Sequence, residues 1–150
     1  RLGKAGEPNF FPNNIHHEVG KGVVLRKGKK ICIVTTGNVL KEAMDAVDML
    51  NSENVAPTLV HMPTIKPFDS TLIQKLTKNH KFIVSVEEHR IINGLGSVIA
   101  DILAARGAGT KLVKLGIDDV FISRPGTQAF LRKQVGIDTE NIVKTIKSYY

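Results

Sequence analysis

The chain has 150 residues, which suits one domain large enough to bury a substantial core. Its composition, 42% hydrophobic and 23% charged, is that of a globular protein, and no apolar run approaches the roughly 20 residues that span a bilayer. The single cysteine, Cys32, excludes an intrachain disulfide, suits a reducing compartment and is expected to be a small buried hydrophobe. The sequence starts at Arg1 with no methionine or signal peptide, so we expect a piece of a longer protein.

The net charge of +7 is unevenly distributed, because the first 30 residues carry seven Lys or Arg against two acids. Nucleic-acid binders usually combine a basic stripe with aromatic side chains, and aromatic residues are only 5% here, so we disfavour that class. The basic cluster RKGKK (26–30) centres on Gly28 and predicts a solvated turn. Two explanations of this positive charge remain, the binding of a phosphorylated small molecule and a plain charged surface.

After a polar lead (1–20), short strands alternate with helical segments. Residues 22–35 predict two strands around a turn at 27–29, and Ile31–Thr35 is the buried strand. Asn38 is expected to cap a helix that runs to about Leu50, and a strand follows at 57–62.

The second half repeats this alternation. Asp69 is expected to cap a short helix before a buried strand at 81–86, and an amphipathic helix covers 95–103. A further strand follows at 111–117, and Thr127 and Asp138 are expected to cap two final helices. Apolar strands alternating with helices predict an α/β fold, doubly wound, with a mostly parallel five-stranded sheet and helices on both faces.

Gly94 and Gly96 follow a strand and open a helix, as in a dinucleotide-binding turn. The third glycine of that motif is missing, because Ile99 stands there, and no ribose-binding acid lies about 20 residues further on. The glycines are better explained by a tight turn and a close approach of the helix to the sheet.

Glu87, Glu88 and His89 are expected just past the carboxyl end of a parallel strand, where sites of α/β proteins usually form. Neighbouring carboxylates beside a histidine can do acid–base chemistry. Because residues adjacent in sequence need not converge, we favour a hydrogen-bonded corner that faces a neighbouring domain.

Thr36, Gly37 and Asn38 lie at the predicted start of the first helix, where free N–H groups and the helix dipole favour an anion. The lysine of a P-loop is absent, so we keep these residues only as a candidate anion site. No Cys or His pair complements His16 and His17 at metal-ligand spacing, so no metal site is predicted.

Four segments in order resemble the C-terminal domain of the transketolase family. They are TGNVLKEAMDAVDML (36–50), MPTIKPFDSTLI (62–73), SVEEHRIINGLGSVIADIL (85–103) and GIDDVFISRPGTQAFLRKQVGIDTENIVKTI (116–146). Deoxyxylulose-phosphate synthases and β subunits of 2-oxo-acid dehydrogenases share this domain, and TIKPFD resembles transketolase itself. Asn93 stands where the family often has glycine, and asparagine tolerates the left-handed backbone that such a turn needs.

The resemblance implies residues 21–150 as the C-terminal domain and residues 1–20 as the tail of the pyrimidine-binding domain and a mobile linker. It implies a cytoplasmic homodimer, or an assembly of split subunits, that uses thiamine diphosphate and Mg²⁺ to move two-carbon ketol units between sugar phosphates. Both cofactors would lie in the preceding domains, so no catalytic residue and no cofactor is expected on this chain. The domain itself would support packing, the subunit interface or regulation.

The resemblance also assigns a role to two residues near the start. Lys4 falls where the family has an arginine that contacts the substrate phosphate, and Arg1 falls at the preceding arginine. Lysine keeps the charge but loses the bidentate geometry of arginine. Two other hypotheses remain, a non-catalytic anion- or partner-binding module and a dinucleotide-binding domain.

Overall fold

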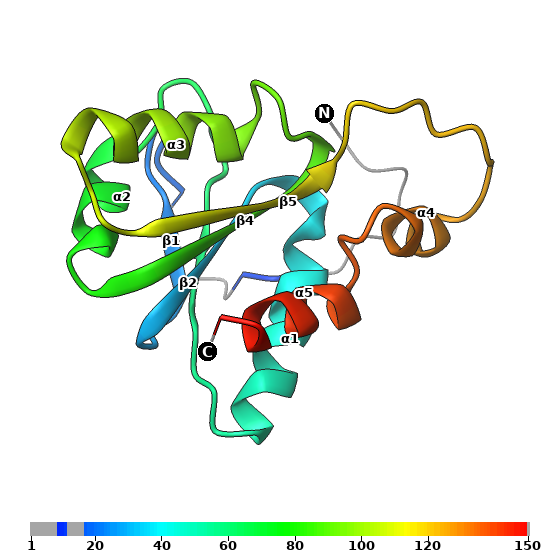
Figure 1. Ribbon diagram of the computed structural model, residues 1–150, viewed down its shortest axis with the longest axis horizontal. Coiled ribbons are helices and arrows are strands. Elements are labelled where there is room, and N and C mark those ends of the chain that lie inside the picture. The colour runs from blue at the N-terminus through cyan, green and yellow to red at the C-terminus, as the bar shows by residue number, and fades with distance from the viewer. Residues whose placement is uncertain (1–8, 12–16, 150) are drawn as a thin grey trace.

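The computed structural model describes residues 9–11 and 17–149 and shows a five-stranded sheet between two layers of helices (Figure 1). The strands are β1 (Val23–Arg26), β2 (Lys30–Thr35), β3 (Thr58–His61), β4 (His80–Arg90) and β5 (Lys111–Ile117). The helices are η1 (Gly37–Val39, a 3₁₀ turn), α1 (Leu40–Ser52), α2 (Ser70–Thr77), α3 (Leu95–Arg106), α4 (Gln128–Gln134) and α5 (Thr139–Lys147). The predicted α/β class is confirmed, and no described helix is long and apolar enough to cross a membrane.

The sheet has the strand order β1-β3-β2-β4-β5, and the four strands β3, β2, β4 and β5 are parallel. β1 is an antiparallel edge strand on β3. The two strands predicted around the basic turn therefore both form, but they do not pair with each other because β3 lies between them. Helical crossovers join the parallel strands, which is the connection that such strands require.

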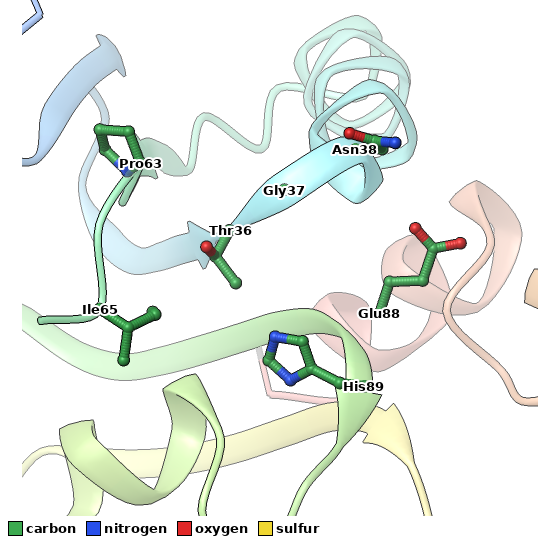
Figure 2. Close-up of a pocket in the computed structure, with 7 residues that line it drawn as sticks. All are labelled: Thr36, Gly37, Asn38, Pro63, Ile65, Glu88 and His89. Carbon is green, nitrogen blue, oxygen red and sulfur yellow. The ribbon is translucent and has the colours of Figure 1, made fainter. Parts of the chain in front are cut away.

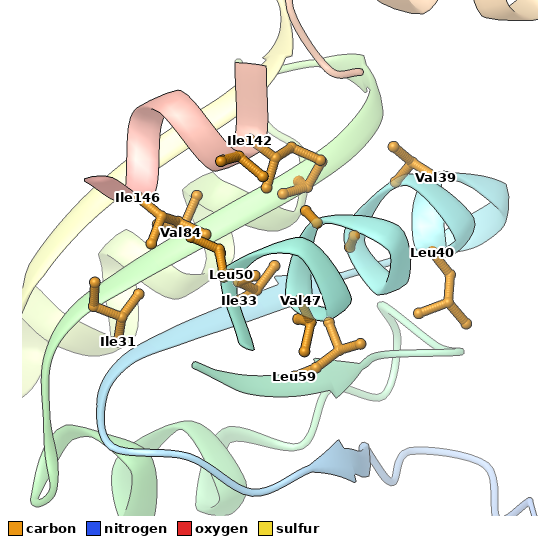
Figure 3. Close-up of a cluster of buried hydrophobic side chains, with 14 of the residues drawn as sticks. Ile31, Ile33, Val39, Leu40, Val47, Leu50, Leu59, Val84, Ile142 and Ile146 are labelled. Carbon is orange, nitrogen blue, oxygen red and sulfur yellow. The ribbon is translucent and has the colours of Figure 1, made fainter. Parts of the chain in front are cut away.

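The first hydrophobic layer lies under α1 and α5, which pack against each other below the sheet in Figure 1. Ile31 and Ile33 of β2 point to this side together with Val84 of β4 (Figure 3). Leu50 of α1 and Ile146 of α5 cover them, and all five side chains are at most 1% exposed. Each large aliphatic side chain buried in this way contributes roughly 1.5–3 kcal/mol.

The second layer lies under α2 and α3 on the opposite face (Figure 1). Cys32 and Val34 point to this side because side chains alternate along β2, and Ile99 of α3 packs over them. Burial raises the pKa of the Cys32 thiol, so the prediction of an inert buried hydrophobe is confirmed. Both faces of β2 are dry, which explains the unbroken apolar run in its sequence.

The predicted helix caps are partly correct. The side chains of Asp69 and Thr127 accept hydrogen bonds from the N–H groups of Leu72 (2.9 Å) and Phe130 (3.2 Å). Asp138 occupies the N-cap position of α5 without a side-chain cap bond. The prediction that Asn38 caps the first helix is wrong.

Asn38 lies inside η1, a 3₁₀ turn that begins after Thr36 and precedes the α-helix. Gly37 has a φ of 68°, which lets the chain leave the strand sharply and enter the turn before α1 starts at Leu40. The apolar periodicity predicted the helix correctly. Its start lies at Leu40, later than predicted, because the 3₁₀ turn comes first.

β4 is longer than predicted, because it runs to Arg90 rather than ending at Val86. Its pairing with β5 resumes beyond an irregularity, where Arg90 lies opposite Ile117. Glu87, Glu88 and His89 therefore belong to the strand itself, and their predicted place past its end is wrong. Consecutive side chains on a strand point to opposite faces, so this extension decides where each of the three points.

His61 is a buried histidine at the carboxyl end of β3. It is 7% exposed, its Nδ1 lies 3.0 Å from the Thr35 hydroxyl, and the ring of Phe11 lies against it at 5.7 Å between centroids. Burial, with a smaller effect of the nearby His17, lowers the pKa of His61 to about 4 from an ordinary 6.5. The ring is therefore neutral at pH 7.

This pKa predicts a loss of stability in acid. Unfolded His61 binds a proton as the pH falls through 6.5, while the folded protein binds it only near pH 4. The stabilisation from neutral His61 is complete above pH 6.5 and disappears toward pH 4, by at most about 3 kcal/mol. Urea unfolding at several pH values should show a steeper loss for the wild type than for His61→Gln.

Side-chain NMR gives the matching direct measurement, because other acids also titrate in this range. The ring resonances of His61 should remain those of a neutral imidazole down to about pH 5. An inflection for His61 between pH 6 and 7 contradicts the assignment.

Candidate functional site

The carboxyl edge of the sheet contains a topological switch point between β2 and β4. The chain leaves β2 toward α1 on one face, and it leaves β4 toward α3 on the other. The two loops diverge and open a crevice between the neighbouring strands. In open α/β sheets this crevice is the usual place for a ligand.

A pocket of about 280 Å³ lies in this crevice (Figure 2). It brings together residues that the sequence singled out separately, the candidate anion site at 36–38 and two members of the corner, Glu88 and His89. Its lining residues are Thr36, Gly37, Asn38, Pro63, Ile65, Glu88 and His89. The loop after β3 supplies Pro63 and Ile65, which the sequence did not indicate as site residues.

Glu87 is the buried member of the corner. Its side chain is 0% exposed, and its two carboxylate oxygens accept hydrogen bonds from the N–H groups of Leu95 (2.6 Å) and Gly96 (2.9 Å). These N–H groups open α3, so the carboxylate satisfies the positive end of that helix. The place where a dinucleotide phosphate would bind is therefore filled by the protein's own carboxylate.

His89 lies two residues further along the strand and on the same side as Glu87. Its Nδ1 lies 2.8 Å from Glu87 Oε2, and its side chain is 41% exposed. Figure 2 shows the ring below Thr36, with Ile65 on one side and Glu88 on the other. The carboxylate of Glu87 fixes Nδ1 as a hydrogen-bond donor. The other ring nitrogen, Nε2, can therefore form one hydrogen bond with a ligand.

Glu88 points away from His89, as alternation along a strand requires (Figure 2). Its carboxylate accepts from Arg132 Nε (3.2 Å) and Nη2 (3.1 Å) in a forked arrangement, and it also accepts from the side-chain amide of Gln128. Arg132 is 8% exposed. A charged side chain buried to this extent requires such partners.

Arg132 extends the network to the first helix. Its Nη1 donates to Glu42 Oε1 at 3.3 Å, and Glu42 Oε2 accepts from both the N–H (3.1 Å) and the hydroxyl (2.6 Å) of Thr139. The network therefore joins β4, α1, α4 and the start of α5. Its members lie up to 97 residues apart, and no local spacing in the sequence could have revealed it.

The candidate anion site is less open to a ligand than its sequence predicted. The Thr36 hydroxyl donates to the carbonyl of Met62 at 2.9 Å, and η1 has only three residues, too few for a strong helix dipole. The carboxylate of Glu88 also lines the pocket. The Thr36 hydroxyl and the Glu88 carboxylate, which could otherwise act as nucleophiles, are both engaged inside the domain, so the geometry supports contact with a neighbouring surface better than catalysis.

Gly94 and Gly96 permit the close approach of α3 to the sheet that the sequence predicted. A Cβ at Gly94 would overlap Glu87 Oε2 and come within 2.7 Å of the Arg90 carbonyl, and one at Gly96 would come within 2.6 Å of Ser85 Oγ. Asn93 has a φ of 60°, so the left-handed turn survives without glycine as expected.

Two predicted regions lie outside the site. Arg1, Lys4 and part of the linker predicted at 1–20 are not among the described residues. Among residues 9–11 and 17–149, no three His, Cys, Asp or Glu side chains come together to hold a metal ion.

Gly94→Ala should destabilise the fold by about 1–3 kcal/mol, because the added methyl overlaps the carboxylate that caps α3. Gly109→Ala is the matched control, since a Cβ there meets nothing within 4 Å. Urea denaturation of both variants measures the difference. Equal midpoints for the two variants contradict the close packing at Gly94.

Arg132→Met keeps the apolar stem and removes the cation between Glu42 and Glu88. We expect a loss of about 2 kcal/mol, because two largely buried carboxylates lose their partner. Lys133→Met removes a neighbouring cation whose side chain is 69% exposed, and it should cost less than about 0.5 kcal/mol. Thermal unfolding of both variants checks the contrast, and similar losses would show that the network contributes nothing specific.

The comparisons with known proteins agree on one family. The family model described as "Transketolase, C-terminal domain" matches residues 20–142. A protein named as a transketolase C-terminal section from Methanocaldococcus jannaschii is 40% identical over 129 residues, covering 86% of this chain and 40% of its own.

Other relatives carry different names. One subunit of an apulose-4-phosphate transketolase from Actinobacillus succinogenes is 38% identical over 91% of this chain and 44% of its own. A 1-deoxy-D-xylulose-5-phosphate synthase from Chlorobium luteolum is 34% identical over 89% of this chain and 21% of its own. The chain thus spans less than half the length of these relatives.

A solved structure gives the same answer. A split-gene transketolase, described as an inactive tetramer of four β subunits, superimposes with a TM-score of 0.86 at 33% identity, over 95% of this chain and 46% of that one. The family model covers residues 20–142, and the structural match covers 95% of the chain. The chain belongs to the transketolase C-terminal domain family.

Proposed function

We propose that this chain is the C-terminal domain of a cytoplasmic transketolase that transfers two-carbon ketol units between sugar phosphates. One observation carries the proposal, the 40% identity to a protein named for this section of transketolase. The parent enzyme is a homodimer or an assembly of split subunits. The similarity to one subunit of an apulose-4-phosphate transketolase and to a split-gene transketolase supports the split arrangement.

The domain's own role in this proposal is to pack against the rest of the enzyme. The acids at the carboxyl edge are engaged inside the domain, Glu87 by α3 and Glu88 by Arg132. Beside them, the loop between β5 and α4 is exposed along residues 118–127, and Phe121 is 93% exposed. Figure 1 shows this loop projecting from the body of the domain. An internally locked corner beside an exposed apolar loop suits an interface with the preceding domains.

The cofactors in this proposal, thiamine diphosphate and Mg²⁺, bind in the rest of the enzyme. The described residues do not fit them, because the pocket lining pairs its carboxylate with Arg132 and no acidic cluster is available for a metal. By resemblance alone, Lys4 contacts the substrate phosphate, and Arg1 falls at the preceding arginine of the family motif. Thr36, Gly37 and Asn38 remain a secondary anion site in a non-catalytic module, which is the alternative outside the enzyme class.

A second candidate function is supported by the relatives themselves. Several 1-deoxy-D-xylulose-5-phosphate synthases, among them proteins of Chlorobium luteolum and Dechloromonas aromatica, are 34–38% identical to the chain. The segment TIKPFD, which resembles transketolase, is the reason for placing this candidate second. A 2-oxo-acid dehydrogenase β subunit is a third member of the same group.

Reconstitution tests the proposal. The chain is purified alone and together with the protein encoded directly upstream or in the adjacent reading frame, with thiamine diphosphate and Mg²⁺ present. We expect no turnover from the chain alone and ketol transfer between sugar phosphates from the complete enzyme. In the complete enzyme, Lys4→Ala should raise KM for phosphorylated sugars more than for unphosphorylated ones.

The outcomes separate the candidates. Formation of 1-deoxy-D-xylulose 5-phosphate without ketol transfer selects the second function. Absence of a thiamine-binding partner in both coding contexts contradicts both enzyme assignments and favours the non-catalytic module.

A further inference from the structure

The amino edge of the sheet carries a strong excess of positive charge. At this edge the parallel strands begin, α1, α2, α3 and α5 end, and the chain turns between β1 and β2 (Figure 1). These segments carry nine Lys or Arg side chains, all exposed, and one acid, Glu53. The segments are 26–30, 51–58, 77–81, 105–111 and 146–149.

The carboxyl edge has the opposite balance. Its turns carry six acids and three basic side chains among the described residues. The segments are 36–40, 62–70, 87–95, 117–128 and 136–139. A charge separation of this kind gives the domain a positive potential at one end, so an anion approaches the amino edge in preference to the pocket at the carboxyl edge.

Part of this excess has an ordinary explanation. Lys78, Arg106 and Lys147 lie at the ends of α2, α3 and α5, where a cation interacts favourably with the helix dipole. Lys147 also pairs with Glu53 at 2.5 Å. The basic side chains of the turn at 26–30 end no helix, so the dipole does not account for them.

The turn at 26–30 is held in place by a chain of hydrogen bonds to buried side chains of β3 and β4. The N–H of Gly28 donates to the hydroxyl of Thr58 at 3.0 Å, Thr58 bonds His80 Nε2 at 2.8 Å, and His80 Nδ1 bonds the carbonyl of Leu76 at 2.9 Å. Thr58 and His80 are buried. A buried chain of hydrogen bonds therefore fixes the backbone from which the lysines project.

The backbone of the turn also packs closely against the loop between α1 and β3. The N–H of Lys29 donates to the carbonyl of Ala56 at 3.0 Å, and a Cβ at Gly28 would come within 2.6 Å of the Pro57 carbonyl. A hollow of about 520 Å³ lies beside these contacts. It is lined by Lys27, Gly28, Lys29, Lys30, Asn54 and Ala56.

We infer that this hollow binds the phosphate chain of a multiply phosphorylated ligand. Three lysines on a rigid turn supply several positive charges to one small region, which matches a compact polyanion. Within the described chain no carboxylate pairs with Lys27 or Lys29, so both ammonium groups are available, whereas Lys30 has a partner of its own. The lining contains no aromatic side chain on which a base could stack. The group that the site recognises is therefore the phosphate chain, whichever molecule carries it. The site lies at the opposite edge from the proposed domain interface and does not depend on the proposed function.

Calorimetric titration with inorganic tripolyphosphate at low ionic strength tests this site on the 150-residue chain. We expect saturable one-to-one binding. The double variant Lys27→Gln/Lys29→Gln should raise Kd by about tenfold. The control Lys21→Gln/Lys66→Gln removes the same charge from two exposed lysines outside the amino edge and should change Kd by less than about twofold. Circular dichroism and urea unfolding verify that both variants fold.

Two further probes distinguish the source of the anion. Adenosine triphosphate binding as tightly as tripolyphosphate identifies the phosphate chain as the recognised group, and tighter binding adds a nucleoside contribution at the same site. An oligoglutamate peptide that binds more tightly than tripolyphosphate overturns the inference in favour of an acidic protein. Equal weakening by the two double variants, or no saturable binding to the wild type, also overturns it.

Discussion

The buried carboxylate of Glu87 is the interaction on which the carboxyl edge depends. A carboxylate removed from water is costly unless hydrogen bonds and positive charge compensate it. Here the first N–H groups of α3 and the ring of His89 surround it. The same contact explains the glycine at position 94 and the direction of His89, because the glycine leaves room for the carboxylate and the histidine ring points toward it.

The sequence around Gly94 and Gly96 resembles a phosphate-binding turn, but in the structure the carboxylate of Glu87 occupies the position of the phosphate. A helix N-terminus attracts an anion, and an acidic side chain within reach of it competes with any ligand. In this domain the competing group is covalently attached and buried, so it is always present. The neighbouring Glu88 points to the other side, where Arg132 and Glu42 join three helices to the strand. Two adjacent acids in one strand therefore stabilise two different parts of the fold.

Charge is distributed along the direction of the strands. The edge at which the strands end holds Glu87 and Glu88 in internal hydrogen bonds, and it displays an exposed apolar loop. The edge at which the strands begin displays lysines that few internal partners neutralise. The two ends of one domain thus offer different chemistry, which suits the proposed interface at one end and the inferred anion site at the other.

The sequence by itself determined the strands, the helices and the family, because apolar periodicity and four ordered motifs are local properties that survive without tertiary information. It also indicated the Asp69 and Thr127 caps, which need only contacts three residues apart. It placed Asn38 and the end of β4 incorrectly, since Gly37 and the pairing of Arg90 with Ile117 decide those boundaries. Only the tertiary structure decided what the acids do. Glu87 needs the start of α3 and Glu88 needs Arg132 from 44 residues away, and such partners meet only when the chain has folded.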